Sequence, residues 1–488
     1  MSKESNRHSF VRVLLAALFC AGLLLPLPAQ AADHAPGRLL LPFAGDKACA
    51  GRNDPNMPLG VQMYGNTSRK SPYMPYLLQS GASWVRVLVQ WRTIEATQGT
   101  YNFSSVESAI AAYRDACVNI ILLIDYTADW AATQTGASGY PNRSPIKTAN
   151  LDDYANFVAA LAERYDGDKM NDSPSGLVVN YIELYNEPDY YKDGVDGGGW
   201  GNAGARYAEM LATVQPKLKA ANPNAKLVFG GIAHDFFAGE EATGVFVRSF
   251  LDNVLTAGGG DHFDIMNLHY YPKNRANWTD DPDSTGFAEK IQAVRAILAA
   301  HGYGDKPIIV TEVGWHSNAS EIFPSTEEIQ SRYVVQLLAQ ALANDVQIVI
   351  WWMLYSPGSD HPFDDGLVTE NLPGSPTTTK PAFAVYQQAV RRLGYAQFTA
   401  ALTTAEVGAA DLEVYQFFNT STSQTTYVAW HNPSESDAPA TLTLSIAAAT
   451  VYSKNGTLIG VVNDGDDGLT DSKIKVQVGG SPVYIVVK

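Results

Sequence analysis

Short apolar runs alternate with helical stretches over most of this 488-residue chain. The runs are rich in β-branched and aromatic residues, which is typical of strands, and apolar residues between them recur at helical spacing. Eight such runs lie at 59–64, 84–91, 119–125, 179–188, 225–231, 263–271, 307–315 and 346–354. This alternation indicates parallel strands covered by helices, because parallel strands need crossover connections and are buried on both faces.

Helical patterns are predicted between these runs, at 73–80, 106–116, 151–165, 205–221, 246–256, 287–301 and 327–344. Their number and order predict an α/β fold, a (β/α)8 TIM barrel, over residues 59–393. The alternative is an open doubly wound sheet, which requires a glycine-rich phosphate loop after its first strand. Tyr64-Gly65-Asn66 occupies that place and lacks this fingerprint.

The pattern changes at about residue 398, where the helical periodicity stops. Short alternating runs follow, separated by Asn, Gly, Ser and Asp clusters, at 412–418, 426–431, 441–446, 451–462 and 474–487. They predict a C-terminal antiparallel β-sandwich domain over 398–488. Its threonine-rich, aromatic-poor middle favours a structural domain packed on the barrel over a carbohydrate-binding module.

The N-terminus has the composition of a secretory signal. Basic residues precede a short apolar run that contains prolines and ends in an Ala-Gln-Ala pattern at residues 29–31. We expect a signal peptide over 1–31, cleaved near Ala31, then a lead-in over 32–58, and a secreted or periplasmic protein. The alternative is an uncleaved anchor, and no later stretch is long and apolar enough to span a bilayer.

Charge and cysteine content limit the possible partners and cofactors. The net charge is −16, and the signal carries about +2, which leaves the mature protein near −18 and argues against nucleic acid or anionic lipid as partner. Cys20 is removed with the signal, so Cys49 and Cys117 form either one disulfide or two free thiols. No Cys/His cluster has metal-ligand spacing. Oligomeric state is not indicated.

Two carboxylates follow strand-like runs at the points where loops begin. The run VNYIELYNEP ends in Asn-Glu-Pro at Glu187, and the run PIIVTEVGW carries Glu312 near its end. In a TIM barrel the C-terminal ends of the strands meet at one face, which carries the chemistry. Glycoside hydrolysis needs such a pair: an acid that protonates the leaving oxygen, and a carboxylate that attacks or stabilises the anomeric carbon.

The residues around this pair resemble clan A of the retaining glycoside hydrolases. The motifs are Asn186-Glu187-Pro188 at the fourth run and Thr311-Glu312-x-Gly-Trp315 at the seventh. Within the clan, the chain is most similar over 59–393 to the family 39 type, including secreted bacterial glycosidases that act on exopolysaccharide. Further supporting motifs lie at 84–86, 99–103, 225–231, 269–271, 364–368 and 380–383.

The resemblance implies a double displacement with Glu187 as acid/base and Glu312 as nucleophile. It implies that Asn186 holds the sugar 2-hydroxyl. It also implies hydrogen bonds to the nucleophile from an arginine of the second strand and a tyrosine of the sixth. A tryptophan of the eighth strand would form the floor of the sugar site. The matching residues here are Arg86, Tyr271 and either Trp351 or Trp352, with Trp352 preferred.

The chemistry itself requires the two carboxylates to differ in protonation, and Arg86 supplies a cation that stabilises the ionised one. No metal or cofactor is needed. His269 contacts either the sugar or backbone near the barrel mouth. Glu183 lies deeper in its run, which suggests a structural ion pair, and Asp125 at the end of the third run is a weaker candidate for substrate contact.

The sequence therefore predicts a secreted retaining glycoside hydrolase that cleaves O-glycosidic bonds of a polysaccharide or glycoconjugate, at β-linked or otherwise equatorial sugars. The alternatives are a catalytically silent carbohydrate-binding protein and a transglycosylase. The presence of an acid and a nucleophile together favours the hydrolase. The sugar, the linkage and endo or exo action depend on the loops 127–150, 188–204 and 272–286, whose composition suits sugar contact in general.

Overall fold

The computed structural model describes residues 54–487 except 66, 115, 135–141, 191–197, 235–244, 272–285, 321–323, 357–362, 371–376 and 433–437. The expected signal peptide and Cys49 lie outside the described residues, so export stays a prediction. Cys117 is disulfide-bonded. The described residues all belong to one compact unit, and the division of this unit into separately folding domains also stays a prediction.

Eight parallel strands form the barrel and confirm the predicted fold. They are β1 (Leu59–Val61), β2 (Trp84–Gln90), β3 (Asn119–Asp125), β4 (Tyr181–Leu184), β5 (Lys226–Val228), β6 (Met266–Tyr270), β7 (Ile308–Val313) and β8 (Val346–Trp351). They pair in the order β5-β4-β3-β2-β1-β8-β7-β6. Parallel bridges from Val228 to Ile265 and from Ile232 to Leu268 join β5 to β6 and close the ring.

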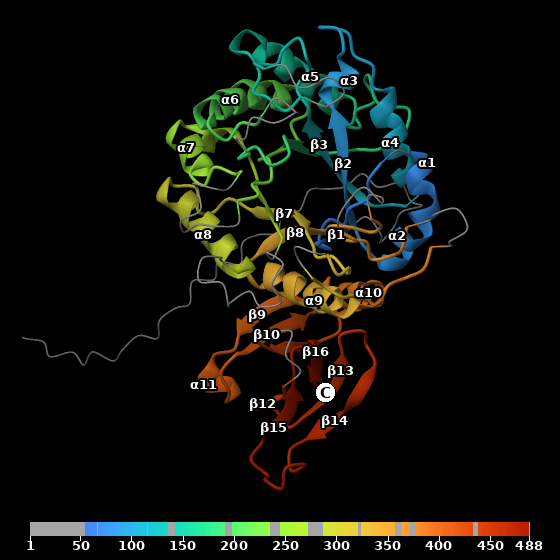
Figure 1. Cartoon of the computed structure of the whole chain (residues 1–488), viewed down its shortest axis with the longest axis vertical. Helices are drawn as coiled ribbons and strands as arrows, with labels where there is room; N and C mark the ends of the chain where they lie inside the picture. Colours follow the sequence, from blue (N-terminus) through green and yellow to red (C-terminus); the bar gives the residue numbers. More distant parts are fainter. Residues whose placement is uncertain are drawn as a thin grey trace, which may run out of the picture. The chain divides into compact units, whose positions relative to one another are not determined.

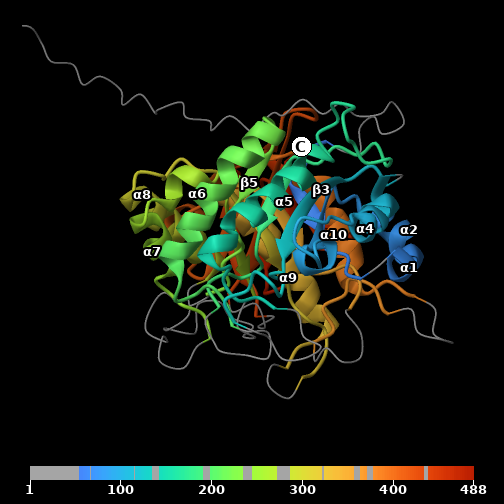
Figure 2. The same cartoon turned by 90° about the horizontal axis from the view of Figure 1, so that it is seen from above.

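Helices surround these strands (Figure 1). They are α1 (Thr67–Lys70), α2 (Met74–Ser80), α3 (Trp91–Ile94), α4 (Ser104–Arg114), α5 (Leu151–Glu163), α6 (Gly204–Ala221), α7 (Phe250–Thr256), α8 (Phe287–Ala300), α9 (Glu327–Ala343) and α10 (Pro381–Leu393), with 3₁₀ turns at Ser71–Tyr73, Thr148–Asn150 and Gly259–His262. Neighbouring helices such as α5 and α6 pack beside each other in both views (Figure 2). In the described part of the chain, none of these helices combines the length and apolarity needed to cross a membrane.

One expected helix begins later than its apolar pattern indicates. The pattern predicts a helix from Phe246, but α7 begins at Phe250. Phe246 instead forms an antiparallel bridge with Tyr190, in the loop that follows β4. A residue held in a bridge has extended backbone, so the helix starts only after it.

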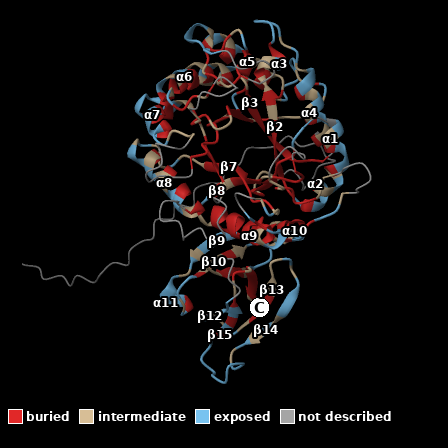
Figure 3. Ribbon diagram, viewed as in Figure 1, coloured by how far each residue is buried: buried red, intermediate tan, exposed pale blue. Residues whose placement is uncertain are grey.

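The interior of the barrel has two layers: an apolar lower layer, and a polar upper layer nearer the C-terminal ends of the strands. Buried side chains fill the lower layer: Trp84, Ile121, Tyr181, Val228, Ile265, Ile309, Ile348 and Ile350. Residues two positions further along a strand point the same way, toward the barrel interior. On four strands these next residues are Arg86, Glu183, Asn267 and Thr311, all buried. Figure 3 shows the buried strands inside helices whose outer faces are exposed. A polar layer therefore lies directly above the apolar core.

The C-terminal part is antiparallel, as predicted. Its strands are β9 (Gln397–Ala401), β10 (Leu412–Asn419), β11 (Gln424–His431), β12 (Ala440–Leu444), β13 (Ala448–Ser453), β14 (Leu458–Asn463), β15 (Ile474–Val478) and β16 (Val483–Val487), with a short helix α11 (Thr404–Val407). Six of them form one sheet in the order β14-β13-β16-β11-β10-β9, and β12 pairs with β15. The expected run 451–462 is two strands, because Gly456 at φ 85° makes a turn between them.

Both faces of the six-stranded sheet pack against apolar cores. Tyr427 and Ala429 of β11 pack in a core with β12 and β15, whereas the alternating residues Val428 and Trp430 belong to the core of the barrel. Helices α9 and α10 lie between the barrel strands and this sheet (Figure 1). The sandwich is therefore packed on the barrel through an apolar face, with polar contacts such as the hydrogen bond from Gln340 Nε2 to Glu413 Oε2 at 2.9 Å.

Candidate active site

Arg86 is the centre of the polar layer. Its Nε and Nη2 donate to the two oxygens of Glu183 at 2.8 and 2.7 Å, and its Nη1 donates to Oε1 of Glu312 at 2.5 Å. Arg86 and Glu183 are both buried. The ion pair expected of Glu183 is therefore present. It fixes the guanidinium in a bidentate geometry and aims one of its donors at Glu312.

Glu312, at the mouth end of β7, is held through both oxygens. Its Oε2 accepts a hydrogen bond of 2.7 Å from the hydroxyl of Tyr271, which follows β6. Burial raises the pKa of Tyr271 well above its usual value, so the phenol remains a neutral donor. A cation on one oxygen and a phenol on the other both stabilise an ionised carboxylate.

Glu187 lies in the turn after β4 and has a different environment. Its φ is 49°, in the left-handed region that non-glycine residues rarely adopt and that recurs at functional sites. The side chain is 22% exposed, and its Oε1 lies 3.1 Å from Nδ1 of His269. Desolvation raises the pKa of Glu187, opposed by the positive charges of Arg143, Arg86 and Lys290. This carboxyl group therefore favours the protonated form more than an exposed glutamate does.

His269 connects Glu187 to the interior of the barrel. Its side chain is fully buried, and its Nε2 lies 3.1 Å from Oγ1 of Thr311. Burial lowers the pKa of His269 to about 3, so the imidazole is neutral at ordinary pH. A neutral imidazole has one donor and one acceptor nitrogen. The contact with Glu187 thus suits either a protonated carboxyl group, which donates to Nδ1, or a carboxylate, which accepts from Nδ1–H.

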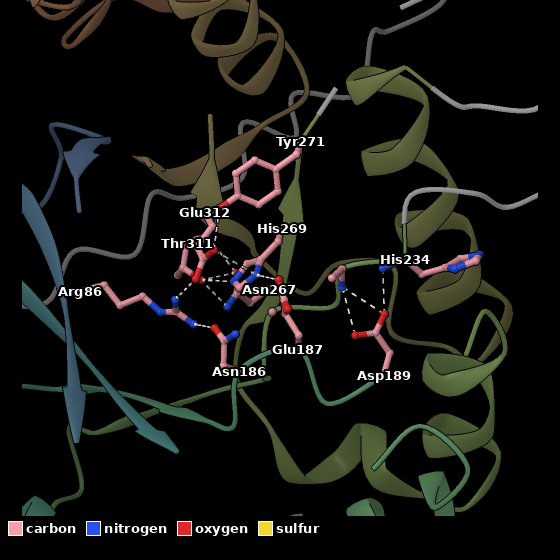
Figure 4. Close-up of polar contacts among 12 residues, drawn as sticks. Arg86, Asn186, Glu187, Asp189, His234, Asn267, His269, Tyr271, Thr311 and Glu312 are labelled. Carbon is pink, nitrogen blue, oxygen red and sulfur yellow. Dashed lines mark hydrogen bonds and ion pairs between the residues drawn. The ribbon is translucent and has the colours of Figure 1, made fainter. Parts of the chain in front are cut away.

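Sequence analysis missed the hydrogen bonds below His269. Asn267 Nδ2 donates to Glu183 Oε1 at 2.9 Å and to Thr311 Oγ1 at 2.8 Å, and Asn267 Oδ1 accepts from the Thr311 amide at 3.1 Å. Through Asn267 and Thr311 the network joins Glu183, the partner of Arg86, to His269. Figure 4 shows Asn267 and Thr311 beside His269. The available signal was the two-residue strand period, which places Asn267 on the same face as His269.

The two predicted catalytic carboxylates lie close together. One oxygen of Glu187, one oxygen of Glu312 and one ring nitrogen of His269 are all within 4.8 Å of one another. Two carboxylates and an imidazole are also ligand types for a divalent metal. Arg86 already contacts Glu312 at 2.5 Å, so a metal ion would compete with a fixed cation for that carboxylate.

A cavity of about 580 Å³ opens beside these residues, within the size range of small-molecule sites. Its lining includes Arg86, Asn186, Glu312 and Trp352. Trp351 is completely buried, so of the two candidate tryptophans it is Trp352 that reaches the cavity. Asn186 Oδ1 accepts a hydrogen bond of 2.8 Å from Arg86 Nη2. The structure thus brings together every residue of the predicted site.

Arg143 is a further cavity residue that sequence analysis missed. Its Nε lies 3.4 Å from Oδ2 of Asp125, and its guanidinium lies over the ring of Tyr126, 5.3 Å from the centroid. It lies in a loop without strand or helix pattern, so its sequence context gives no sign of where its side chain points. Asp125, Tyr126 and Arg143 all line the cavity.

Solved structures share this fold at low sequence identity. A family 39 glycoside hydrolase from Bacteroides cellulosilyticus WH2 is 18% identical, with a TM-score of 0.65 over 90% of this chain and 82% of that chain. A monomeric beta-xylosidase from Caulobacter crescentus CB15 is 14% identical, with a TM-score of 0.57 over 89% of this chain and 96% of that one. A GH30 endoxylanase from Clostridium papyrosolvens C71 is 14% identical, with a TM-score of 0.57 over 88% and 96%.

No curated protein matches the sequence significantly. The family model described as cellulase (glycosyl hydrolase family 5) matches residues 49–356, which include all eight barrel strands and both glutamates. The expected clan A barrel is thereby confirmed, with family 5 as the matching family model and family 39 among the similar folds. Because the match covers well over half of this chain, the chain belongs to the cellulase (glycosyl hydrolase family 5) family and is a TIM-barrel glycoside hydrolase that acts on carbohydrate.

Proposed function

We propose that this glycoside hydrolase is a retaining enzyme, with Glu187 as acid/base and Glu312 as nucleophile, acting on O-glycosidic bonds of a polysaccharide or glycoconjugate. The main support is the short separation of the carboxylates, with one oxygen of each within 4.8 Å of the other. Retaining glycosidases hold the two carboxyl groups about 5–5.5 Å apart, whereas inverting ones leave about 6.5–9.5 Å for a water.

The different surroundings of the two carboxylates support the assignment of roles. Glu312 accepts hydrogen bonds from a guanidinium and a phenol, which suits an anionic nucleophile. Glu187 has a raised pKa and contacts a neutral imidazole, which suits a group that carries a proton. Two carboxyl groups with such different hydrogen-bond partners are suited to different roles in catalysis.

In the first step, Glu187 gives its proton to the glycosidic oxygen while an oxygen of Glu312 attacks the anomeric carbon. The bond from that carbon to the leaving oxygen breaks, and an ester forms between the sugar and Glu312. In the second step, Glu187 takes a proton from water as the water oxygen attacks the anomeric carbon. The ester bond breaks, and the Glu312 carboxylate and the Glu187 acid are restored.

The remaining predicted residues have supporting roles in this proposal. Asn186 holds the sugar 2-hydroxyl, and Trp352 forms the floor of the sugar site beside the cavity. His269 orients Glu187 from inside the barrel, so its contact with sugar is indirect. The steps need no metal or cofactor, because the residues themselves supply the proton and the nucleophile. Export through the segment 1–31 belongs to the same proposal.

The test uses the protein over residues 32–488, aryl glycosides of several sugars, and bacterial and plant polysaccharides. NMR of the first-formed product reports the anomeric configuration before mutarotation. Retention of configuration by the wild type, with no turnover by Glu312→Gln, is the expected result. Inversion would overturn the retaining mechanism. Sugar binding without turnover by the wild type would identify a silent carbohydrate-binding protein.

A further inference from the structure

Lys290 is a fully buried lysine at the catalytic end of the barrel. It lies in the first turn of α8, is 0% exposed, and donates a hydrogen bond of 2.6 Å from Nζ to the backbone oxygen of His269. Lysine is almost never fully buried without a partner, because removing its charge from water is costly. A cation is also unfavourable near the positive end of a helix dipole. The contacts of the ammonium therefore indicate what keeps a lysine at this position.

The carbonyl that Lys290 contacts lies at an irregular point of the barrel. The register between β6 and β7 shifts immediately before His269, which pairs with Glu312. The amide of His269 donates to the oxygen of Ile232 at 2.9 Å, and the oxygen of His269 accepts from Lys290. A register shift disrupts the ladder and redirects the side chains beside it. Lys290 thus stabilises the backbone of a residue whose direction depends on that shift.

The ring of His269 connects this backbone contact to the proposed acid/base. Its Nδ1 lies 3.1 Å from Oε1 of Glu187, and its Nε2 lies 3.1 Å from Oγ1 of Thr311. The ring also lies close to Gly231, where an added Cβ would be 2.2 Å from Nε2. A ring enclosed in this way follows its backbone. A shift of the backbone that Lys290 holds would therefore move the imidazole away from Glu187.

The charge of Lys290 also acts on Glu187. The ionisable groups around Glu187 in the described part of the chain come from several elements: Arg86 of β2, Arg143, Asp189, His269 of β6, Lys290 of α8 and Glu312 of β7. Desolvation raises the pKa of Glu187, and the three cations oppose this rise. Arg86 and Arg143 are among the described residues that line the cavity, and Lys290 is not. Lys290 therefore supports the carboxylate form of Glu187 from behind the site.

We propose that Lys290 is a positioning residue for the acid/base. Its hydrogen bond holds the backbone of His269, which keeps the imidazole against Glu187. Its charge favours the Glu187 carboxylate that takes a proton from water in the second step. The inference rests on the proposed function and extends it to a residue outside the cavity lining.

Two substitutions separate the hydrogen bond from the charge. Lys290→Met removes both and keeps an unbranched side chain. Lys290→Gln removes the charge but keeps a donor, on a side chain one atom shorter. The matched control is Lys306→Met, because Nζ of Lys306 donates to the backbone oxygen of Phe263 at 2.7 Å, before β6 begins and far along the strand from His269. Melting temperatures show which variants are folded, and Lys290→Gln carries the test if Lys290→Met is not.

The readout is the steady-state kinetics of a dinitrophenyl glycoside over a range of pH, made with the sugar that the wild type hydrolyses. Its leaving group needs little protonation, so kcat reports the second step and kcat/KM the first. We expect kcat of Lys290→Met to fall about tenfold, and kcat of Lys290→Gln to fall less. In both variants kcat/KM should change less than about threefold. Lys306→Met should match the wild type in both parameters.

The pH profile distinguishes this role from a merely structural one. The second step needs ionised Glu187, so kcat falls as the pH drops through the pKa of that group. Loss of the cation raises this pKa, so the acid limb of kcat should move to higher pH by about half a unit or more in both Lys290 variants. An acid limb that stays in place in folded variants would overturn the proposal. An equal fall of kcat and kcat/KM without a shifted limb would also overturn it.

The outcomes separate this inference from the proposed function. If the wild type retains configuration and needs both glutamates, but the Lys290 variants behave like Lys306→Met, only the role of Lys290 is wrong. If the wild type inverts configuration, or Glu312→Gln keeps full turnover, the proposed function fails and the role of Lys290 fails with it.

Discussion

Arg86 reaches Glu312 with Nη1 2.5 Å from Oε1, while its Nε and Nη2 remain on the carboxylate of Glu183. One side chain of β2 thereby connects β4 to β7 inside the barrel. The position of the proposed nucleophile depends on the forked shape of the guanidinium as well as on its charge, because a single point charge cannot satisfy three oxygens in different directions.

Arg86→Lys is expected to reduce both stability and activity. The ammonium keeps the charge but cannot contact both glutamates, which leaves buried carboxylate oxygens without donors. We expect a loss of roughly 2 kcal/mol or more in the free energy of unfolding, measured in urea, and a fall in kcat of about a hundredfold. Arg92→Lys on α3 is the control. Unchanged unfolding and unchanged kcat would contradict the central role of the guanidinium.

Glu312→Gln should abolish turnover while keeping the fold. The amide retains the size of the side chain but is a poor nucleophile, so kcat should fall on the order of a thousandfold or more. The exposed Glu209→Gln on α6 serves as control and should behave like the wild type. In wild-type protein, a 2-fluoro glycoside should label Glu312, detected by mass spectrometry of its peptide. A label on another residue would show that the nucleophile is misassigned.

Glu187→Ala should slow hydrolysis according to the leaving group. Without the proton donor, unactivated glycosides should lose roughly 10²- to 10⁴-fold in rate, whereas activated aryl glycosides should lose much less in the first step. Azide should restore turnover of the activated substrate and yield a glycosyl azide of retained configuration. An unchanged rate on an unactivated substrate would mean that another residue is the acid.

The pH dependence of kcat/KM should follow the protonation of Glu187. The acid form is required, so activity should fall as the pH rises through its pKa, which desolvation raises. The charge of Arg143 opposes that shift, so Arg143→Gln should move the alkaline limb to higher pH. The exposed Lys147→Gln in the same loop is the control. A limb that stays in place in Arg143→Gln would exclude this electrostatic effect.

Asp189 should make stability depend on pH. Its carboxylate accepts backbone hydrogen bonds from Ala233 and His234, yet burial raises its pKa from 3.8 to about 7. The folded state then binds the proton more tightly, so the stabilisation is complete below pH 4 and is lost as the pH rises toward 7. Melting temperatures from pH 4 to 8 should show this decline, and Asp189→Asn should flatten it relative to Asp129→Asn. Equal slopes in the two variants would contradict it.

The barrel and its site were predictable because both follow short-range patterns. A strand of period two fixes which side chains face the interior, and barrel strands deliver their last residues to one face. Glu187 and Glu312 are separated by more than a hundred residues, yet their places at strand ends suffice to bring them together. The ion pair of Glu183 was predictable for a related reason, since a carboxylate deep in a strand needs a partner.

Contacts that depend on loops or on pairing between strands were not predictable. Arg143 faces Asp125 from a loop without periodicity, and the hydrogen bonds of Asn267 to Thr311 and Glu183 depend on how three strands align. The same limit explains the run 451–462, where apolar residues continue across a turn that Gly456 makes. The two-residue period of a strand predicts which way a side chain points. Which residue it contacts depends on the register between neighbouring strands.

Glu183 gives Arg86 a counter-ion that takes no part in bond making. In the proposed cycle, Glu312 loses its negative charge while the sugar is attached and regains it on hydrolysis. An arginine paired with Glu312 alone would be a buried cation without a counter-ion for the lifetime of the intermediate. Burying an unpaired charge is costly, so its side chain would tend to change position. Glu183 accepts hydrogen bonds from two of the three guanidinium nitrogens of Arg86 throughout the cycle. The guanidinium is therefore expected to keep its position through both half-reactions, and to pair with the Glu312 carboxylate again without reorganisation once the sugar is released.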